Sequence, residues 1–223
     1  MITFLLAEAE VERMPPELLR HPKVAARAKK RRRAPGDLLL DQALDHDAMR
    51  ALPDADRRGR PDIAHLFLLL ALDSPLTKRG LTRVLIHTRH DELIRVRPDT
   101  RIMRHQPKFV ALLEDLLRQG EVPRGDPLLT AERDRPLEGV VRELPGTRVL
   151  LDAAGAPARS PRFADLARAG DVSVALGGFP RGAFRQAQPS WFDHVLRVAD
   201  EEITAAAALV PALAGFEDAL LGG

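Results

Sequence analysis

A glycine-rich stretch near the carboxyl end of the chain could bind a ligand through its backbone. Residues 175–182 read ALGGFPRG and follow an apolar, β-branched run, 171–176, that is typical of a buried strand. Three glycines within six residues let the backbone approach another group closely, and Pro180 restricts the loop. Ligands of α/β sheets usually bind at loops that follow the carboxyl ends of strands. A plain tight turn remains the alternative, because the stretch has neither the GxGxxG pattern of a dinucleotide site nor the GK[ST] ending of a phosphate loop.

Arg60 and Asp62 form a second candidate for chemistry. A carboxylate two residues away can fix the orientation of a guanidinium, and an oriented guanidinium binds a phosphate or a base edge through two hydrogen bonds. Asp62 could equally cap the helix that Pro61 is expected to begin, so both interpretations stay open. Arg101 and Arg104 stand three residues apart in a second expected loop.

The basic residues are gathered in clusters, although the net charge is only +2. A sequence pI of 9.4 with arginine dominating favours phosphate contacts and hence a polyanionic partner, while each cluster alone could also be a solvated face. The aromatic content of 4% argues against an extended surface that stacks single-stranded bases. The clusters are Arg20, Lys23, Arg27, Lys29, Lys30, Arg31, Arg32 and Arg33; Arg57, Arg58 and Arg60; and Arg95, Arg97, Arg101, Arg104 and Lys108.

The composition excludes several other kinds of site. The 223 residues include no cysteine, which excludes disulfides, zinc–thiolate sites and thiol catalysis. The seven histidines form no HExxH motif and no close cluster with carboxylates along the chain, so we expect no metal site. Ser74 and Ser190 lack the GxSxG surroundings of a hydrolase nucleophile.

The sequence gives no sign of a membrane segment. No run of about 18 apolar residues occurs. The apolar residues 1–6 are followed at once by Glu8, Glu10 and Glu12, so they indicate neither a membrane span nor a signal sequence. We therefore expect a cytoplasmic protein with no membrane partner.

The elements that must position these residues alternate between strands and helices. This pattern predicts an α/β protein in which a β-hairpin and a helix form an inserted unit. We expect strands at 2–7, 38–40, 81–88, 93–97, 148–152 and 171–176. We expect a first helix that begins at 15–16, and further helices at about 23–33, 42–52, 63–72, 107–119, 136–144, 160–168 and 192–221. His65 falls beside the apolar positions Ile63, Leu66, Leu69 and Leu70, so we interpret it as packed or partly exposed rather than as a ligand.

Several motifs, in order along nearly the whole chain, resemble the Nep/Emg family of ribosome biogenesis, pseudouridine methyltransferases of the SPOUT class. They are RPDIAH at 60–65, DSPL at 73–76, IHT at 86–88, RIMR at 101–104 with KF at 108–109, and GGFPRG at 177–182. LLAEAE at 5–10, KKRR at 29–32 and LLLD at 38–41 are similar to the archaeal branch.

The resemblance implies a single SPOUT-like α/β domain over 1–223, with a deep C-terminal trefoil knot and a family-specific insertion at about 74–108. It also implies a homodimer that methylates N1 of a pseudouridine in small-subunit rRNA with S-adenosyl-L-methionine as the methyl donor. By the resemblance, Asp62 would position Arg60. Its implied cofactor-binding residues are Gly177, Gly182, Trp191, Phe192, Asp193, His194, Val195 and Leu196, and its implied RNA-binding residues are Arg60, Arg101, Arg104 and Lys108.

The chain departs from the family pattern at three places. Met103 replaces a proline, Trp191 and Phe192 replace leucine and tyrosine, and Lys108 replaces an arginine and so loses the two-point fork. No residue is identified as the catalytic base, because a carboxylate held by Arg60 would be a weak one.

Two further functions remain open from the sequence. A non-catalytic rRNA-binding assembly factor of the small subunit is the main alternative, and other assembly factors are then expected partners. A hydrolase or dehydrogenase of small molecules has no motif behind it.

Overall fold

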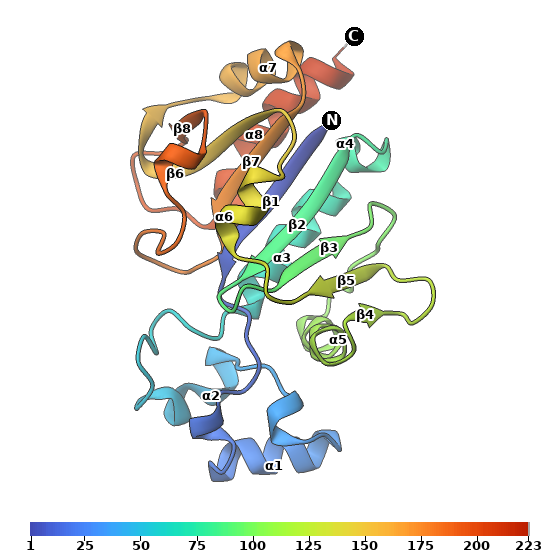
Figure 1. Ribbon diagram of the computed structural model, residues 1–223, viewed down its shortest axis with the longest axis vertical. Helices are drawn as coiled ribbons and strands as arrows, with labels where there is room; N and C mark the ends of the chain where they lie inside the picture. Colours follow the sequence, from blue (N-terminus) through green and yellow to red (C-terminus); the bar gives the residue numbers. More distant parts are fainter. Residues whose placement is uncertain (223) are drawn as a thin grey trace.

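The computed structural model describes residues 1–222 and contains a mixed sheet of eight strands. Five neighbouring strands run parallel, and three more extend the sheet as antiparallel neighbours. The α/β class and the hairpin expected at 81–97 are therefore confirmed. In order across the sheet, the strands are β4 (Glu121–Val122), β5 (Leu129–Glu132), β3 (Leu93–Val96), β2 (Thr82–Thr88), β1 (Ile2–Ala9), β7 (Val172–Gly177), β6 (Thr147–Pro157) and β8 (His194–Arg197) (Figure 1).

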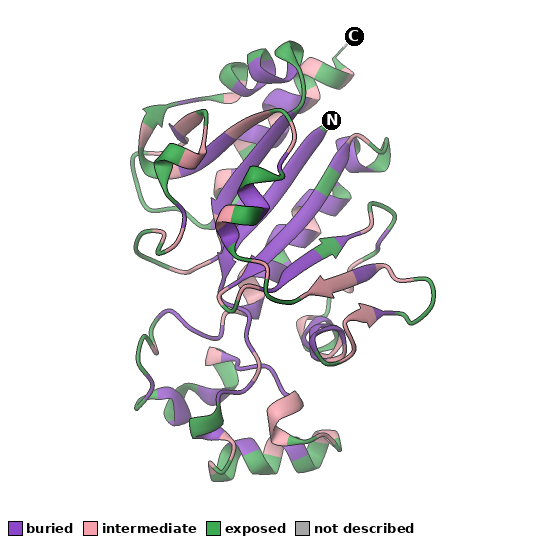
Figure 2. Ribbon diagram, in the orientation of Figure 1, coloured by how far each residue is buried: buried purple, intermediate pink, exposed green. Residues whose placement is uncertain are grey.

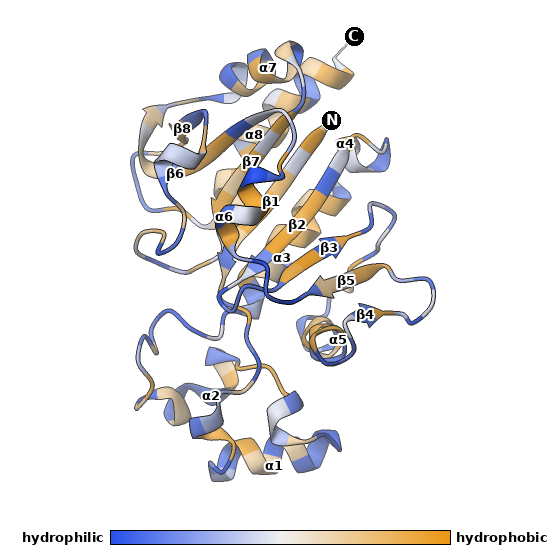
Figure 3. Ribbon diagram, in the orientation of Figure 1, coloured by the Kyte–Doolittle hydropathy of each residue, from blue (hydrophilic) through white to orange (hydrophobic). Residues whose placement is uncertain are grey.

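Strand β1 lies inside the sheet and is buried along its whole length (Figure 2). It is flanked by β2 and β7 and covered on both faces, which is why its sequence reads as a continuous apolar run rather than an alternating one. Phe4 and Leu6 face the larger core, and Leu5 and Ala7 face the smaller one. Figure 3 shows hydrophobic residues along the central strands and also on the helices that cover the sheet.

Helices cover the two faces of the sheet unequally. The larger core contains side chains of α3 (Pro61–Asp73), α5 (Gln106–Gln119), α7 (Ser160–Ala169) and α8 (Ala205–Leu221). The smaller core on the other face is closed by α6 (Leu137–Arg142). The short helix α4 (Pro75–Lys78) leads from α3 towards β2.

Residues 13–58 form a small N-terminal lobe beside the carboxyl end of β1 (Figure 1). The lobe carries α1 (Pro22–Arg31) and α2 (Gln42–Met49), with Asp41 capping α2 as the sequence predicts. Its own core includes Val24, Leu38, Leu40 and Met49. Three-residue 3₁₀ helices lie at Pro16–Leu18 and Pro35–Asp37 in the lobe, and at Pro189–Trp191 before β8.

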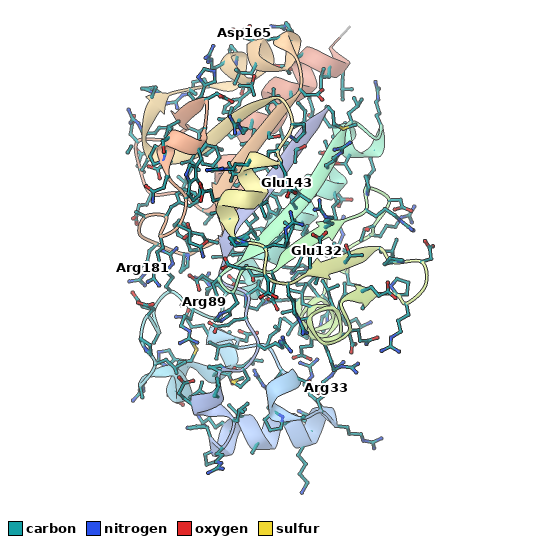
Figure 4. The ribbon with its side chains drawn as sticks, viewed as in Figure 1. Arg33, Arg89, Glu132, Glu143, Asp165 and Arg181 are labelled. Atoms are coloured by element: carbon teal, nitrogen blue, oxygen red, sulfur yellow. The ribbon has the colours of Figure 1, made fainter. Side chains whose placement is uncertain are left out.

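Ion pairs join the lobe to α5. Arg31 Nη1 lies 2.8 Å from Glu114 Oε1, and Arg33 donates two hydrogen bonds, of 2.8 and 2.9 Å, to Asp115 (Figure 4). Part of the first basic cluster therefore serves to attach the lobe, because these guanidiniums are already paired with carboxylates.

The prediction of a helix over 192–221 is wrong for its first residues, 192–204. Val195 and Leu196 instead pair with β6, and α8 begins only at Ala205, where Thr204 caps it. The free edge of β6 supplies backbone partners that the sequence alone does not reveal. The same reason explains β4 and β5, which were not predicted and which pair beyond β3 on either side of the proline-containing residues 123–127.

Two local predictions are also wrong. Residues 38–40 are buried but form only one bridge, Leu39 to Arg13, because the lobe offers them no sheet to join. Helix α3 buries Phe67 and Leu68, and it leaves Leu66, a predicted core position, 48% exposed. A long apolar run such as α3 does not by itself reveal which face turns inward.

Strand β6 bends around β8. Leu196 pairs with both Leu151 and Ala156, so residues 152–155 pass around it. A Cβ on Gly155 would lie 2.6 Å from the backbone of Leu196, which leaves room only for glycine. The deep trefoil knot implied by the resemblance stays a prediction.

Residues 74–108 contain α4, the β2–β3 hairpin and the start of α5. Because β2 pairs directly with β1, the segment is part of the central sheet. Its status as a family-specific insertion stays a prediction. Among residues 1–222, no helix combines the length and the apolar character that crossing a bilayer requires.

Candidate functional site

A cavity of about 370 Å³ opens at the carboxyl ends of β6, β7 and β8. Ligands of parallel α/β sheets bind at this end of the strands, and the volume lies within the range of small-molecule sites. The lining is 151–154, 176–177, 179–184, 196–199, 201–203, Ala205 and Ala208.

The loop after β7 forms one wall of this cavity, and we call residues 178–188 the glycine loop. A Cβ on Gly177 would lie 2.6 Å from the ring of Phe179, and one on Gly178 would lie 2.5 Å from Cα of Ala9. Gly182 has φ +80°, a conformation that side chains disfavour. Gly177 and Gly178 therefore allow close approach to Phe179 and Ala9, and Gly182 allows a left-handed turn of the backbone.

A buried cluster of acids and arginines supports the glycine loop from behind. Arg57 donates to Glu10 at 2.7 Å and to Glu8 at 3.2 Å, and Arg58 donates to both oxygens of Glu12 at 2.8 and 2.7 Å. Each of these five side chains is less than 10% exposed. Sequence reasoning missed this cluster, because Arg57 and Arg58 read as part of a basic surface.

Charge pairing controls the ionisation of Glu12. Burial by itself would raise its pKa, but hydrogen bonds from Arg58 and His90 and the charges of Arg58 and Arg89 lower the pKa to about 2. The carboxylate is therefore ionised throughout the physiological pH range and balances the Arg58 guanidinium. Arg89 and Arg181 lie at the same junction between the lobe and the sheet (Figure 4).

Arg60 stands where the lobe returns to the sheet. Its Nε and Nη2 atoms donate to the two carboxylate oxygens of Asp62 at 2.8 and 2.6 Å, so the orienting pair considered from the sequence is present. The N-cap position of α3 is occupied by Arg60, and Asp62 lies within the first turn of the helix. The side chain of Arg60 is 27% exposed, so its guanidinium can present its free edge to an anion.

The second arginine pair lies at the other end of α3. Arg101, Arg104 and Lys108 are all exposed, and Arg104 is 85% exposed with Asp73 at 3.3 Å. Buried His65 stacks on Phe109 at 4.5 Å and its Nε2 lies 2.7 Å from the carbonyl oxygen of Met103. His65 is thus a packed residue that fixes this loop against α3, as predicted.

Comparison with known proteins decides the family. The model of the EMG1/NEP1 methyltransferase family matches residues 4–217. The chain belongs to the EMG1/NEP1 methyltransferase family.

Curated relatives and a solved structure agree with this assignment. The protein named ribosomal RNA small subunit methyltransferase Nep1 from Methanothrix thermoacetophila is 40% identical over 99% of this chain and 97% of its own length. The Nep1 of Pyrobaculum neutrophilum is 43% identical over 96% of each chain. The crystal structure of Archaeoglobus fulgidus Nep1 bound to S-adenosylhomocysteine matches with a TM-score of 0.85 at 32% identity, over 97% of each chain.

Three of the eight residues predicted for the cofactor line the cavity of this EMG1/NEP1 methyltransferase: Gly177, Gly182 and Leu196. The other five lie outside the lining, and their role stays a prediction. Trp191, Phe192 and Val195 pack on the core beneath α6, Asp193 accepts from the backbone N–H of Arg148 at 2.7 Å, and His194 pairs with Val149.

The sequence reasoning missed two further walls of the cavity. One is the bend of β6 at 152–154, and the other is the segment 197–203 that follows β8. The first could have been found from the rule that ligand loops follow strand ends, because a strand was expected to end at Asp152. The second required β8, which was not predicted.

The cavity lining of this methyltransferase fits an S-adenosylmethionine-sized ligand. Asp152, Glu201 and Glu202 line it and suit positive charge, while Phe179 and Ile203 offer apolar surface to a flat ring. The glycine loop lets backbone rather than side chain approach the ligand. Within residues 1–222, no group of three or more acidic or histidine side chains is arranged to hold a metal ion.

Proposed function

We propose that this protein transfers a methyl group from S-adenosyl-L-methionine to N1 of a pseudouridine in small-subunit rRNA. The observation that carries the proposal is the glycine-walled cavity at the strand ends of a chain that belongs to the EMG1/NEP1 methyltransferases. The names of its relatives support small-subunit rRNA as the substrate, and the S-adenosylhomocysteine in the Archaeoglobus fulgidus Nep1 structure supports the cofactor. The choice of N1 of pseudouridine rests on the motif resemblance.

The chain contributes mainly binding and alignment to this reaction. S-adenosylmethionine, when bound, supplies a methyl group that is already activated by a sulfonium. The glycine loop and the segment after β8 enclose the cofactor site, and Arg60, oriented by Asp62, holds the RNA near it. Positioning of this kind can provide a large part of the rate acceleration of a transfer reaction. The target base must be unstacked to reach the cavity, so a loop nucleotide is the expected substrate.

Methyl transfer to a short rRNA hairpin tests the proposed function. The protein is incubated with methyl-labelled S-adenosylmethionine and two hairpins that differ only in carrying pseudouridine or uridine at one loop position. We expect label in the pseudouridine hairpin alone. Absence of label from both hairpins at high enzyme concentration would contradict the proposed activity, and equal labelling would contradict the choice of base.

Arg101→Ala and Arg104→Ala should each weaken rRNA binding and reduce its dependence on salt. Each exposed guanidinium that contacts a phosphate releases about one counterion, so each substitution should lower the salt slope by about one. Arg168→Ala is the matched control, because that arginine is exposed and paired with a carboxylate as Arg104 is, but lies on α7, outside the residues predicted to bind rRNA. Filter binding of the hairpin at several salt concentrations measures the slope. An unchanged slope would argue against direct phosphate contacts by the Arg101–Arg104 pair.

We also propose that the protein is a homodimer, with a groove between α3 and α8 as the interface. The apolar part of the groove is lined by Leu69, Leu70, Leu213 and Ala214, with Val210 51% exposed. The polar residues Asp73, Ser74, Arg104 and Glu217 complete the lining. Exposed apolar surface of this kind suits a protein partner. Arg104 is 85% exposed and therefore lies at the rim of this groove, where the dimer contact would border the predicted rRNA-binding surface.

Val210→Asp should convert this dimer into monomers. The new carboxylate would be desolvated against apolar side chains of the partner copy, which costs several kcal/mol. Sedimentation equilibrium gives the molecular mass of each protein. Ala207→Asp, an exposed position on the same helix that does not line the groove, is the control and should stay dimeric. A dimer of unchanged stability in Val210→Asp would exclude this interface.

A further inference from the structure

We propose that Arg57 is a positioning residue for the methyl-donor site, acting through the glycine loop. The inference rests on the proposed function, because it concerns how the same cavity is held in shape. Arg57 lies in the turn that leads from the N-terminal lobe back to the sheet, and it does not line the cavity itself. It acts on two residues that do, Phe179 and Ala183.

The guanidinium of Arg57 holds the glycine loop at two points. Nη1 donates to the carbonyl oxygen of Ala183 at 2.8 Å, and the guanidinium carbon lies 3.9 Å from the ring centre of Phe179. Both Phe179 and Ala183 line the cavity. Gly182 lies between them, and a Cβ there would be 3.8 Å from Nη1 of Arg57. One planar cation thus fixes both the backbone and the aromatic side chain of this wall.

The other side of the guanidinium is fixed by β1 and the residues after it. Nε donates to Glu10 at 2.7 Å and Nη2 donates to Glu8 at 3.2 Å. Glu8 also accepts hydrogen bonds from the backbone N–H groups of Arg185, Gln186 and Ala187. The glycine loop is therefore held to the end of β1 in two ways, directly by Glu8 and indirectly by Arg57. Its position depends on both Glu8 and Arg57.

Phe179 itself is held between two neighbours. Arg57 covers one face of its ring, and Phe184 meets it edge to face at 5.1 Å between ring centres. If the guanidinium were lost, the ring would have open space towards the cavity and could fill part of it. A preordered wall spares the ligand the cost of ordering the loop, so its loss should lower affinity for the cofactor.

The neighbouring Arg58 provides a matched comparison. It is as deeply buried as Arg57 and forms a two-point ion pair with Glu12, but its hydrogen bonds go to Glu12 and the carbonyl of Pro53 rather than to the glycine loop. Substitution of either arginine by lysine keeps the positive charge but removes the planar guanidinium that donates two hydrogen bonds at once. The two substitutions should therefore cost similar stability, and only Arg57→Lys should affect the cavity.

Calorimetric titration with S-adenosylhomocysteine and steady-state kinetics test the proposal on the full-length protein. Arg57→Lys should raise the Kd for S-adenosylhomocysteine and the KM for S-adenosylmethionine about tenfold. The KM for the RNA hairpin should stay unchanged. Arg58→Lys should lower the melting temperature by a similar amount and leave the Kd within about twofold.

The outcomes separate this proposal from the proposed function. Equal Kd changes in Arg57→Lys and Arg58→Lys, or an unchanged Kd in Arg57→Lys, would show that Arg57 only stabilises the fold. If the unsubstituted protein bound no S-adenosylhomocysteine, the proposed function itself would fail. If Arg57→Lys did not fold, the charge-balanced double variants Arg57→Gln with Glu10→Gln and Arg58→Gln with Glu12→Gln would be compared in the same titration, with the same expected contrast.

Discussion

Gly177→Val should weaken the binding of S-adenosylhomocysteine by about 100-fold and leave the protein folded. A Cβ at this position would lie 2.6 Å from the ring of Phe179. The ring cannot retreat easily, because Arg57 packs on its face and Phe184 packs nearly perpendicular to it at 5.1 Å between ring centres. It must therefore move into the cavity or drag the loop with it, and either movement removes space that the ligand needs.

The matched control is Gly139→Val in α6, where an added Cβ meets no atom within 4 Å. Calorimetry gives the affinity of each variant, and thermal unfolding followed by circular dichroism shows that each is folded. The hairpin affinity of Gly177→Val should equal that of the unsubstituted protein, because the exposed arginines are untouched. Unchanged S-adenosylhomocysteine affinity in Gly177→Val would contradict the assignment of the cavity.

Glu12→Gln should lower the free energy of unfolding by about 3 kcal/mol at pH 7. The carboxylate is 1% exposed and accepts two hydrogen bonds from Arg58. Its pKa is lowered from 4.5 to about 2, despite the opposing effect of burial, by Arg58 and His90. A neutral amide would leave the Arg58 guanidinium buried without its counter-charge.

The pH dependence gives this prediction a specific sign. Because the pKa of Glu12 is lower in the folded state, its contribution is fully present above about pH 4.5 and is lost as the pH falls through about 2. The stability difference between the unsubstituted protein and Glu12→Gln should thus shrink over this interval. Urea unfolding at pH 7, 5 and 3 measures it, with Glu138→Gln, an exposed helical carboxylate, as the control. A difference that is the same at all three pH values would contradict the ion-pair explanation.

Local patterns predicted the parts of the fold whose signals lie in a few consecutive residues. The run 171–176 with its following glycines became β7 and the glycine loop, and Pro107 and Gly120 marked the ends of α5 closely. These signals depend on backbone conformations that glycine and proline permit or forbid. The hairpin of β2 and β3 was found from another local signal, two apolar runs joined by the short polar turn 89–92.

Features that depend on distant partners were not predictable in this way. The residues of β8 form a strand only because β6 leaves an edge free, and Leu66 is exposed because Phe67 and Leu68 reach the core. Arg57 and Glu10 are 47 positions apart, and each alone looks like a surface charge. Their burial as a pair supports the candidate site, yet no spacing in the sequence indicates it.

A crystal structure of the protein soaked with S-adenosylhomocysteine tests the central claim most directly. We predict density for the ligand in the cavity at the carboxyl ends of β6, β7 and β8, with the glycine loop on one side and residues 197–203 on the other. The backbone at Gly177 and Gly182 should contact it. Density for the ligand at another place, with this cavity containing only water, would contradict the account.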